Sequence, residues 1–286
     1  MSRIRRGWAL TKKSWALLSE HRSLIRFPIY GAVATTLLAI VFLGPGLYLL
    51  DKDSLAGAIP LLVLGVYVLS VVGFYFSVGL AAAADMIFRG QEATVADGLA
   101  VARSRFSQIC GWAAISTAIS VLMGVLENQG GLGGQIAARL VGMAWSLVTF
   151  LAVPVIAIEG TGPVETLKRS ASIFRERWGT QITGNIAIGG AVFLLGVLPA
   201  VVLIVAGVAL WPSASFLGAL LVVVGALVLA VAMLISRALS GIFGVALYRY
   251  ATEGEAVGGF TSEELESAVK SKRGRNAPPT ATPGTV

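Results

Sequence analysis

The side chains that most often carry out chemistry are sparse in this sequence. It has one histidine, His21, and one cysteine, Cys110. One imidazole excludes a site that needs two, and one thiol excludes an intramolecular disulfide and a multi-cysteine metal site. His21 lies between Glu20 and Arg22 with no nucleophile beside it, which is typical of a solvated face. The sequence therefore predicts no catalytic residue, no metal site and no cofactor.

The most distinctive group of charged residues follows Gly162. Pro163 suits the first position of a helix, because its missing N–H would have no partner there. On that helix the polar sides carry four cations and the apolar side carries a tryptophan: Lys168, Arg169, Arg175, Arg177 and Trp178. Such a helix suits the lipid headgroup boundary. It could contact anionic lipid or a cytoplasmic partner; alternatively, it only anchors a loop and sets the topology.

The composition places these residues in a membrane protein. Hydrophobic residues make up 56% of the 286 positions and charged residues only 13%, about half the charged share of a soluble domain. The net charge of +7 is spread between apolar runs. We therefore expect the anionic membrane surface, and not nucleic acid, to be the partner of the basic residues.

Six apolar runs are each near the length of about 20 residues that a membrane span requires. A helix is the expected conformation, because backbone polar groups in hydrocarbon must be satisfied within the segment. The predicted spans are Phe27–Leu50, Leu55–Ala84, Ile109–Leu126, Ile136–Ile158, Asn185–Leu210 and Phe216–Ser236.

The distribution of cations predicts the orientation of these spans. Of the 22 Lys and Arg residues, all but Lys52 and Arg139 fall in the two termini and the two longer connections. Cytoplasmic segments carry an excess of cations, so both termini are predicted to be cytoplasmic.

A basic amphipathic stretch precedes each of the three predicted hairpins, which suggests an internal repeat. Lys12-Lys13-Ser14 of the first stretch aligns with Lys168-Arg169-Ser170 of the third. Thr94 with Asp97 has the form of a capping box before the second. The apolar faces are predicted at helical spacing: Ile4, Trp8, Thr11, Trp15 and Leu18; Val95, Leu99, Ala102 and Phe106; Val164, Leu167, Ala171, Phe174 and Trp178. The predicted fold is thus an all-α bundle of six spans, arranged as three hairpins, each preceded by a cytoplasmic amphipathic helix.

The C-terminal part divides near Glu253. Apolar character continues past Arg237 to Tyr248, so residues 237–250 either lie along the inner interface or form a short seventh membrane-dipping element. Residues 1–253 form the predicted membrane domain, and 254–286 form a cytoplasmic tail. The tail is expected to hold one short helix over Ser262–Lys270, started by Thr261 with Glu264, and then to be disordered.

The charges near the membrane lie at predicted span ends. Asp85, Arg139, Glu159 and Arg237 all have this position. Ion-coupled transport usually places charges deeper, so these positions weaken that interpretation. They leave open a passive pore or a carrier of apolar molecules.

The sequence resembles an uncharacterised family of prokaryotic multi-pass membrane proteins with a domain of unknown function. The likeness runs from about Gly7 to Glu253. It rests on the following residues: Asp97-Gly98-Leu99, Arg103, Trp112, Trp145-Ser146, Pro154, Glu159, Gly162-Pro163-Val164-Glu165, Lys168-Arg169-Ser170, Trp178-Gly179 and Asn185. The same pattern is distantly similar to the membrane portion attached to some glycerophosphodiester phosphodiesterases. The catalytic domains of those enzymes use paired histidines, so the resemblance implies architecture and no activity here.

We therefore expect a non-enzymatic scaffold or accessory protein of the prokaryotic cytoplasmic membrane, in contact with membrane lipids. A transporter or channel for a small or lipid-like solute is the alternative, favoured by prolines within the spans and the threefold repeat. A membrane-bound enzyme fits least, because the sequence holds no catalytic constellation.

Overall fold

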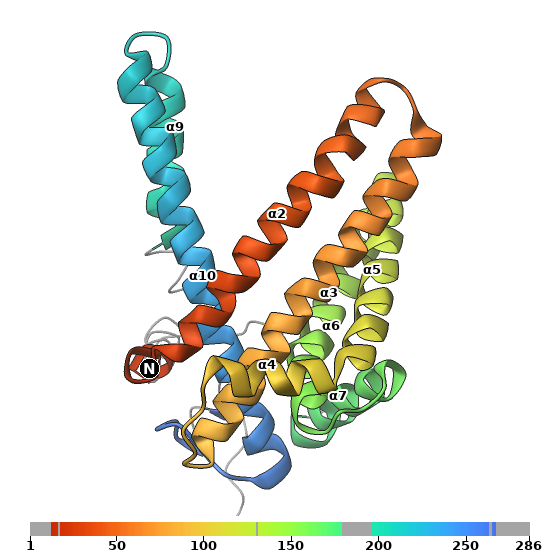
Figure 1. Cartoon of the computed structure of the whole chain (residues 1–286). Coiled ribbons are helices and arrows are strands. Elements are labelled where there is room, and N and C mark those ends of the chain that lie inside the picture. Colours follow the sequence, from red (N-terminus) through yellow and green to blue (C-terminus); the bar gives the residue numbers. More distant parts are fainter. Residues whose placement is uncertain (1–12, 17, 130, 179–195, 263–264, 267–286) are drawn as a thin grey trace, which may run out of the picture.

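The computed structural model describes residues 13–16, 18–129, 131–178, 196–262 and 265–266. The described elements are all helices (Figure 1). They are α2 (Ser23–Asp51), α3 (Leu55–Phe88), α4 (Val95–Ser104), α5 (Phe106–Gln129), α6 (Gly131–Ile158), α7 (Pro163–Trp178), α9 (Leu198–Leu210) and α10 (Ser215–Glu253).

Four of these helices, namely α2, α3, α5 and α10, are long and apolar enough to cross a membrane. Residues 148–158 of α6 pass the same test together with α7, to which they are bent by 118°, so the described chain has up to five spans. The fifth predicted span is represented by the shorter helix α9. Its first part lies outside the described residues. The chain is a multi-span membrane protein.

Two helical hairpins diverge from a common base (Figure 1). One consists of α2 and α3, with α5 and α6 beside α3; the other consists of α9 and α10. Glycine allows α9 and α10 to approach closely: a Cβ on Gly218 would lie 2.7 Å from the carbonyl oxygen of Gly207. The divergent ends expose large apolar side chains, such as Ile40 and Leu227, as lipid-facing helices do.

The core lies at the base, where the lower part of α10 meets α2, α3 and α6. Phe27, Trp112 and Phe243 are fully buried there. Phe243 packs against Phe150 of α6 and against Phe260, which follows α10 in the chain. The tail is therefore attached to the bundle at Phe260 and at the buried Leu265. Most of the helix predicted over Ser262–Lys270 lies outside the described residues.

Helix α10 corrects the interpretation of residues 237–250 as a separate seventh element. It is one helix of 39 residues, and Arg237 does not interrupt it. Its lower part is buried by α2, α3 and α6, from Ala238 to Tyr250 with short gaps. The segment is therefore the continuation of the sixth predicted span and not a separate membrane-dipping element, and protein covers most of it.

The amphipathic helices agree only partly with their predicted faces. The capping box of α4 is confirmed, and its Ala102 is buried. Phe106 belongs to α5 and is 50% exposed. In α7, Leu167 and Phe174 pack inward as predicted, but Val164 is 56% exposed and Ala171 is exposed as well. The buried face of α7 instead contains Thr166, Ser170 and Ile173, which the predicted apolar face did not include. The hydroxyl side chains of Thr166 and Ser170 are small enough to pack closely inside the protein.

The first amphipathic stretch is described only from Lys13, so Ile4, Trp8 and Thr11 lie outside the described residues. Trp15 is exposed and Leu18 is buried. Ser14 and Ser170, which the repeat aligns, are both fully buried. The internal repeat itself stays a prediction.

Candidate functional site

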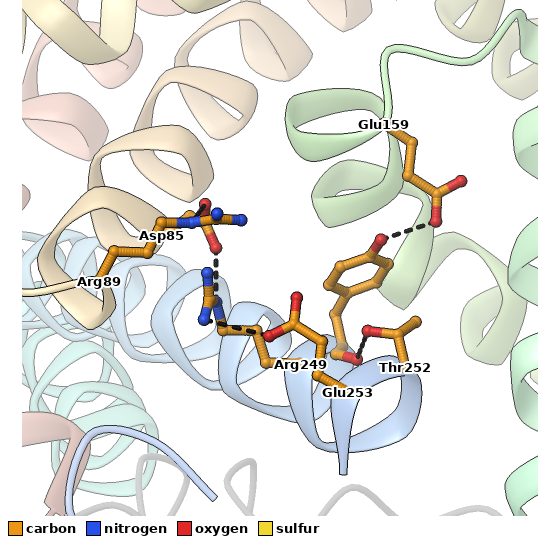
Figure 2. Close-up of polar contacts among 7 residues, drawn as sticks. Asp85, Arg89, Glu159, Arg249, Thr252 and Glu253 are labelled. Carbon is orange, nitrogen blue, oxygen red and sulfur yellow. Dashed lines mark hydrogen bonds and ion pairs between the residues drawn. The ribbon is translucent and has the colours of Figure 1, made fainter. Parts of the chain in front are cut away.

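A buried ion pair joins α10 to the end of α3. Arg249 Nε donates to Asp85 Oδ1 at 2.7 Å, with the two side chains only 6% and 13% exposed (Figure 2). Arg89 Nε donates to the other oxygen of Asp85 at 2.9 Å, and Arg249 Nη1 donates to Glu253 at 3.2 Å. Arg249 and Asp85 thus compensate each other inside the protein, as buried charges must, while Arg89 and Glu253 extend the network to the surface.

A second polar group joins α10 to the end of α6. The Tyr248 hydroxyl donates to Glu159 Oε1 at 2.6 Å. Arg169 of α7 donates to the same carboxylate, with Nε 2.9 Å from Oε1. This hydrogen bond raises the pKa of Arg169, against the opposing effect of its partial burial. Glu159 is therefore a common acceptor for α7 and α10.

Adjacent residues of α10 thus bind residues at the ends of two different helices. Arg249 binds Asp85 at the end of α3, and Tyr248 binds Glu159 just after α6. We call these residues and Arg169 the basal clamp: Asp85, Glu159, Arg169, Tyr248 and Arg249. It fixes the relative positions of α3, α6, α7 and α10, and through Arg169 it sets the orientation of α7.

The loop between α6 and α7 adds local order to this arrangement. Gly160 has a positive φ of 67°, and the guanidinium of Arg105, which lies between α4 and α5, is against it, so a side chain there would clash. Thr161 and Thr166 share a hydrogen bond of 2.7 Å between their hydroxyls. Pro163 is the first residue of α7, as predicted. The direction of α7 is therefore fixed by its entry loop as well as by the clamp.

The structure places the predicted contact residues of α7 in different environments. Lys168 and Arg175 are exposed on the stripe that also contains Val164 and Ala171. Arg169 instead binds Glu159 and is half-buried. The side chains of the other two predicted residues, Arg177 and Trp178, lie outside the described part. Of the described candidates, only Lys168 and Arg175 are available for a partner.

The second amphipathic helix is held by its own cap. Thr94 Oγ1 accepts from the N–H of Asp97, and the Asp97 carboxylate accepts from the N–H of Thr94 at 2.9 Å. The hydrogen bonds from the Thr94 side chain and backbone lower the pKa of Asp97. Within the described residues, no group of three or more His, Cys, Asp or Glu side chains could hold a metal ion.

A separate polar group lies inside the bundle on α5. Trp112 is fully buried, stacks on Trp145 at 5.6 Å and meets the edge of Phe74. Its indole N–H and the buried hydroxyls of Ser116 and Thr117 have no hydrogen-bond partner within the described part of the chain. Ser116 lies one turn beyond Trp112 on the same side of α5, whereas Thr117 is rotated from Ser116 by about 100°.

Sequence reasoning missed Tyr248 and Arg249, the α10 members of the clamp. It placed Asp85 and Glu159 at span ends but assigned neither a partner. Arg249 interrupts an apolar run that begins at Ala238, and such an arginine requires a carboxylate nearby. That rule could have indicated a pair. It could not have identified Asp85, which is 164 positions away.

The comparisons with known proteins give a family and no activity. No curated protein matches the chain. A family model described as a family of unknown function, DUF6159, matches residues 57–259. The match begins within α3 and ends beyond α10, so it includes every member of the basal clamp. Because this segment is well over half of the sequence, the chain belongs to the DUF6159 family.

Proposed function

We propose that this protein is a non-enzymatic scaffold of the prokaryotic cytoplasmic membrane, with six spans and both termini in the cytoplasm. The cation distribution supports this orientation. So do the positions of the structure's polar parts: α4, α7 and the basal clamp share one end of the molecule (Figure 1). In this proposal α6 is a span by itself, and residues 185–210 complete the fifth.

The partner that fits α7 best is the surface of a cytoplasmic protein. The exposed charges of α7 have mixed sign, because Glu165 and Glu176 are exposed together with Lys168 and Arg175. A uniformly anionic headgroup layer would repel the two carboxylates, whereas a protein surface can place a complementary charge opposite each group. The exposed Val164 and Ala171 add a small apolar area between them.

The single observation that carries this proposal is the fixed position of α7. Thr166 and Ser170 are fully buried, and Arg169 is bound to Glu159 beside Tyr248. A helix held in this way presents the same stripe at all times, so less conformational freedom is lost when a partner binds. A loop that only set the topology would need no such attachment.

The experiment is purification of the full chain in native lipid nanodiscs, followed by mass spectrometry of copurifying proteins. We expect a stoichiometric partner with the wild type, and loss of most of it with Lys168→Gln/Arg175→Gln. The matched control is Lys52→Gln/Arg103→Gln, which removes two exposed cations elsewhere and should retain the partner. Equal recovery from both double variants would contradict docking through α7.

The buried polar groups on α5 favour a second candidate function, passage of a small neutral solute. Trp112, Ser116 and Thr117 would provide uncharged hydrogen-bond groups inside the bundle. Buried polar groups in a bilayer usually have a partner, because leaving them unpaired is costly.

Solute flux decides this second candidate. Proteoliposomes should then be more permeable to glycerol or urea than empty liposomes, and Ser116→Ala/Thr117→Val should abolish the difference. Permeability equal to that of empty liposomes would rule it out.

A further inference from the structure

The outward face of α2 is a continuous apolar stripe. Its other face packs on α3, where Gly31 lies against Phe76 and Gly46 against Leu62. The outward side chains recur at helical spacing and are all exposed: Ile29, Tyr30, Val33, Leu37, Ile40, Val41, Leu47 and Tyr48. Because α2 crosses the membrane, this stripe faces lipid.

Two exposed tyrosines mark the depth of α2 in the bilayer. Tyr30 and Tyr48 are 18 positions apart, which corresponds to about 27 Å at the helical rise of about 1.5 Å per residue. The hydrocarbon core is about 30 Å thick, and tyrosine is enriched at both of its boundaries. Arg26 and Arg22 lie one and two turns beyond Tyr30, so they are at the headgroup level of one leaflet.

These two arginines continue the same stripe and carry uncompensated charge. Both are exposed, and neither forms an ion pair with a described residue. The first turn of α2 contains no acidic residue. Arg89, Arg169 and Arg249, in contrast, each bind a carboxylate. Glu20 is also exposed, two residues before Arg22, so the exposed charge at this end of α2 is net positive, whereas the exposed charges of α7 cancel.

We propose that the outward face of α2 binds an anionic phospholipid of the inner leaflet. Arg22 and Arg26 hold the phosphate, and one acyl chain lies along Tyr30, Val33 and Leu37. Two arginines separated by one turn can donate to both non-bridging oxygens of a lipid phosphodiester and neutralise its single negative charge. An anionic lipid provides both a phosphate for the two arginines and an acyl chain for the apolar side chains. A soluble phosphate would provide only the first. Assignment to the inner leaflet depends on the proposed orientation, and the site itself is independent of docking through α7.

The test is a native mass spectrometry titration of the full chain in detergent with phosphatidylglycerol, using phosphatidylcholine as the neutral probe. Each cation near an anionic headgroup contributes roughly fivefold to binding, so Arg22→Gln/Arg26→Gln should weaken phosphatidylglycerol binding about thirtyfold. Arg22→Lys/Arg26→Lys should recover most of it, because charge is restored. Phosphatidylcholine binding should be weak in every variant.

Lys168→Gln/Arg175→Gln is the matched control and should bind phosphatidylglycerol as the wild type does. Its result also separates this proposal from docking through α7, which is tested by the protein partner. Unchanged phosphatidylglycerol binding in Arg22→Gln/Arg26→Gln would overturn the proposal. Equal binding of phosphatidylcholine by the wild type, or equal loss in the α7 double variant, would overturn it as well.

Discussion

Helices are held together by different interactions in the base of the molecule and in the α9–α10 hairpin. The base buries arginine and carboxylate groups, with Arg249 held 2.7 Å from Asp85. The described part of the hairpin brings two backbones together through glycine, with Gly218 against Gly207. In the proposed topology lipid surrounds the hairpin, so helix association there would depend on close van der Waals contact.

The difference explains which part of the molecule can determine a specific arrangement of helices. Glycine contacts set only the distance between two helices, whereas an ion pair also selects its partner and geometry. The basal clamp connects helices that are distant in sequence, and it positions α7 through Arg169. The base is therefore the part of the molecule that substitutions should disturb most.

Loss of the buried Arg249 should reduce the stability of the protein most. Arg249→Met leaves Asp85 buried with only Arg89 as a partner, which should reduce the free energy of unfolding by about 3 kcal/mol. Thermal unfolding of the purified protein in one detergent measures the change. The matched control is Arg89→Met, which removes a more exposed partner of the same carboxylate and should cost at most about 1 kcal/mol. Equal losses would mean that burial of the pair is unimportant.

A methyl group added at Gly218 in the α9–α10 hairpin should cause the next largest loss of stability. In Gly218→Ala the new Cβ meets backbone atoms of Gly207 and Trp211, which cannot move without separating the helices. We expect a loss of about 2 kcal/mol in the same assay. Gly73→Ala is the control, because no atom lies within 4 Å of its added Cβ; this change should be neutral or slightly stabilising. A neutral Gly218→Ala would refute the close packing of α9 and α10.

Removal of one hydroxyl from the clamp should have a smaller effect. Tyr248→Phe removes the 2.6 Å hydrogen bond to Glu159 but leaves Arg169 on that carboxylate. The expected loss is about 1.5 kcal/mol. Hydrogen exchange should increase in α7 more than in α2, because α7 shares Glu159 with Tyr248. Equal exchange in α7 of wild type and variant would show that the clamp does not hold this helix.

The cap of α4 should have the smallest effect, and one that depends on pH. The pKa of Asp97 is lowered in the folded state by its hydrogen bonds with Thr94. Its contribution is therefore present above the unfolded value of about 3.9 and is lost as pH falls through the lower folded value. Local hydrogen exchange of α4 should distinguish wild type from Asp97→Asn at pH 7, and the difference should shrink in acid. A difference independent of pH would contradict the carboxylate's role.

The sequence was sufficient to predict several of the helices, but neither the full length of α10 nor the contacts between helices. The ends of α2, α3 and α5 follow apolar runs whose length the bilayer determines, so hydropathy located them closely. The inward turn of Thr166 and Ser170 was missed because apolar periodicity ignores small hydroxyl residues that pack well. The pairing of Arg249 with Asp85 depends on how α3 and α10 meet, and no local pattern encodes that meeting.

The most direct test of the proposed topology is the labelling of single cysteines with a membrane-impermeant maleimide. In a Cys110→Ser background, Ser213→Cys reports on the α9–α10 turn and Arg103→Cys on α4. We predict that intact cells label Ser213→Cys alone and that permeabilised cells also label Arg103→Cys. Labelling of Arg103→Cys in intact cells, with Ser213→Cys protected, would place the basal clamp and α7 outside the cytoplasm and contradict the proposed scaffold.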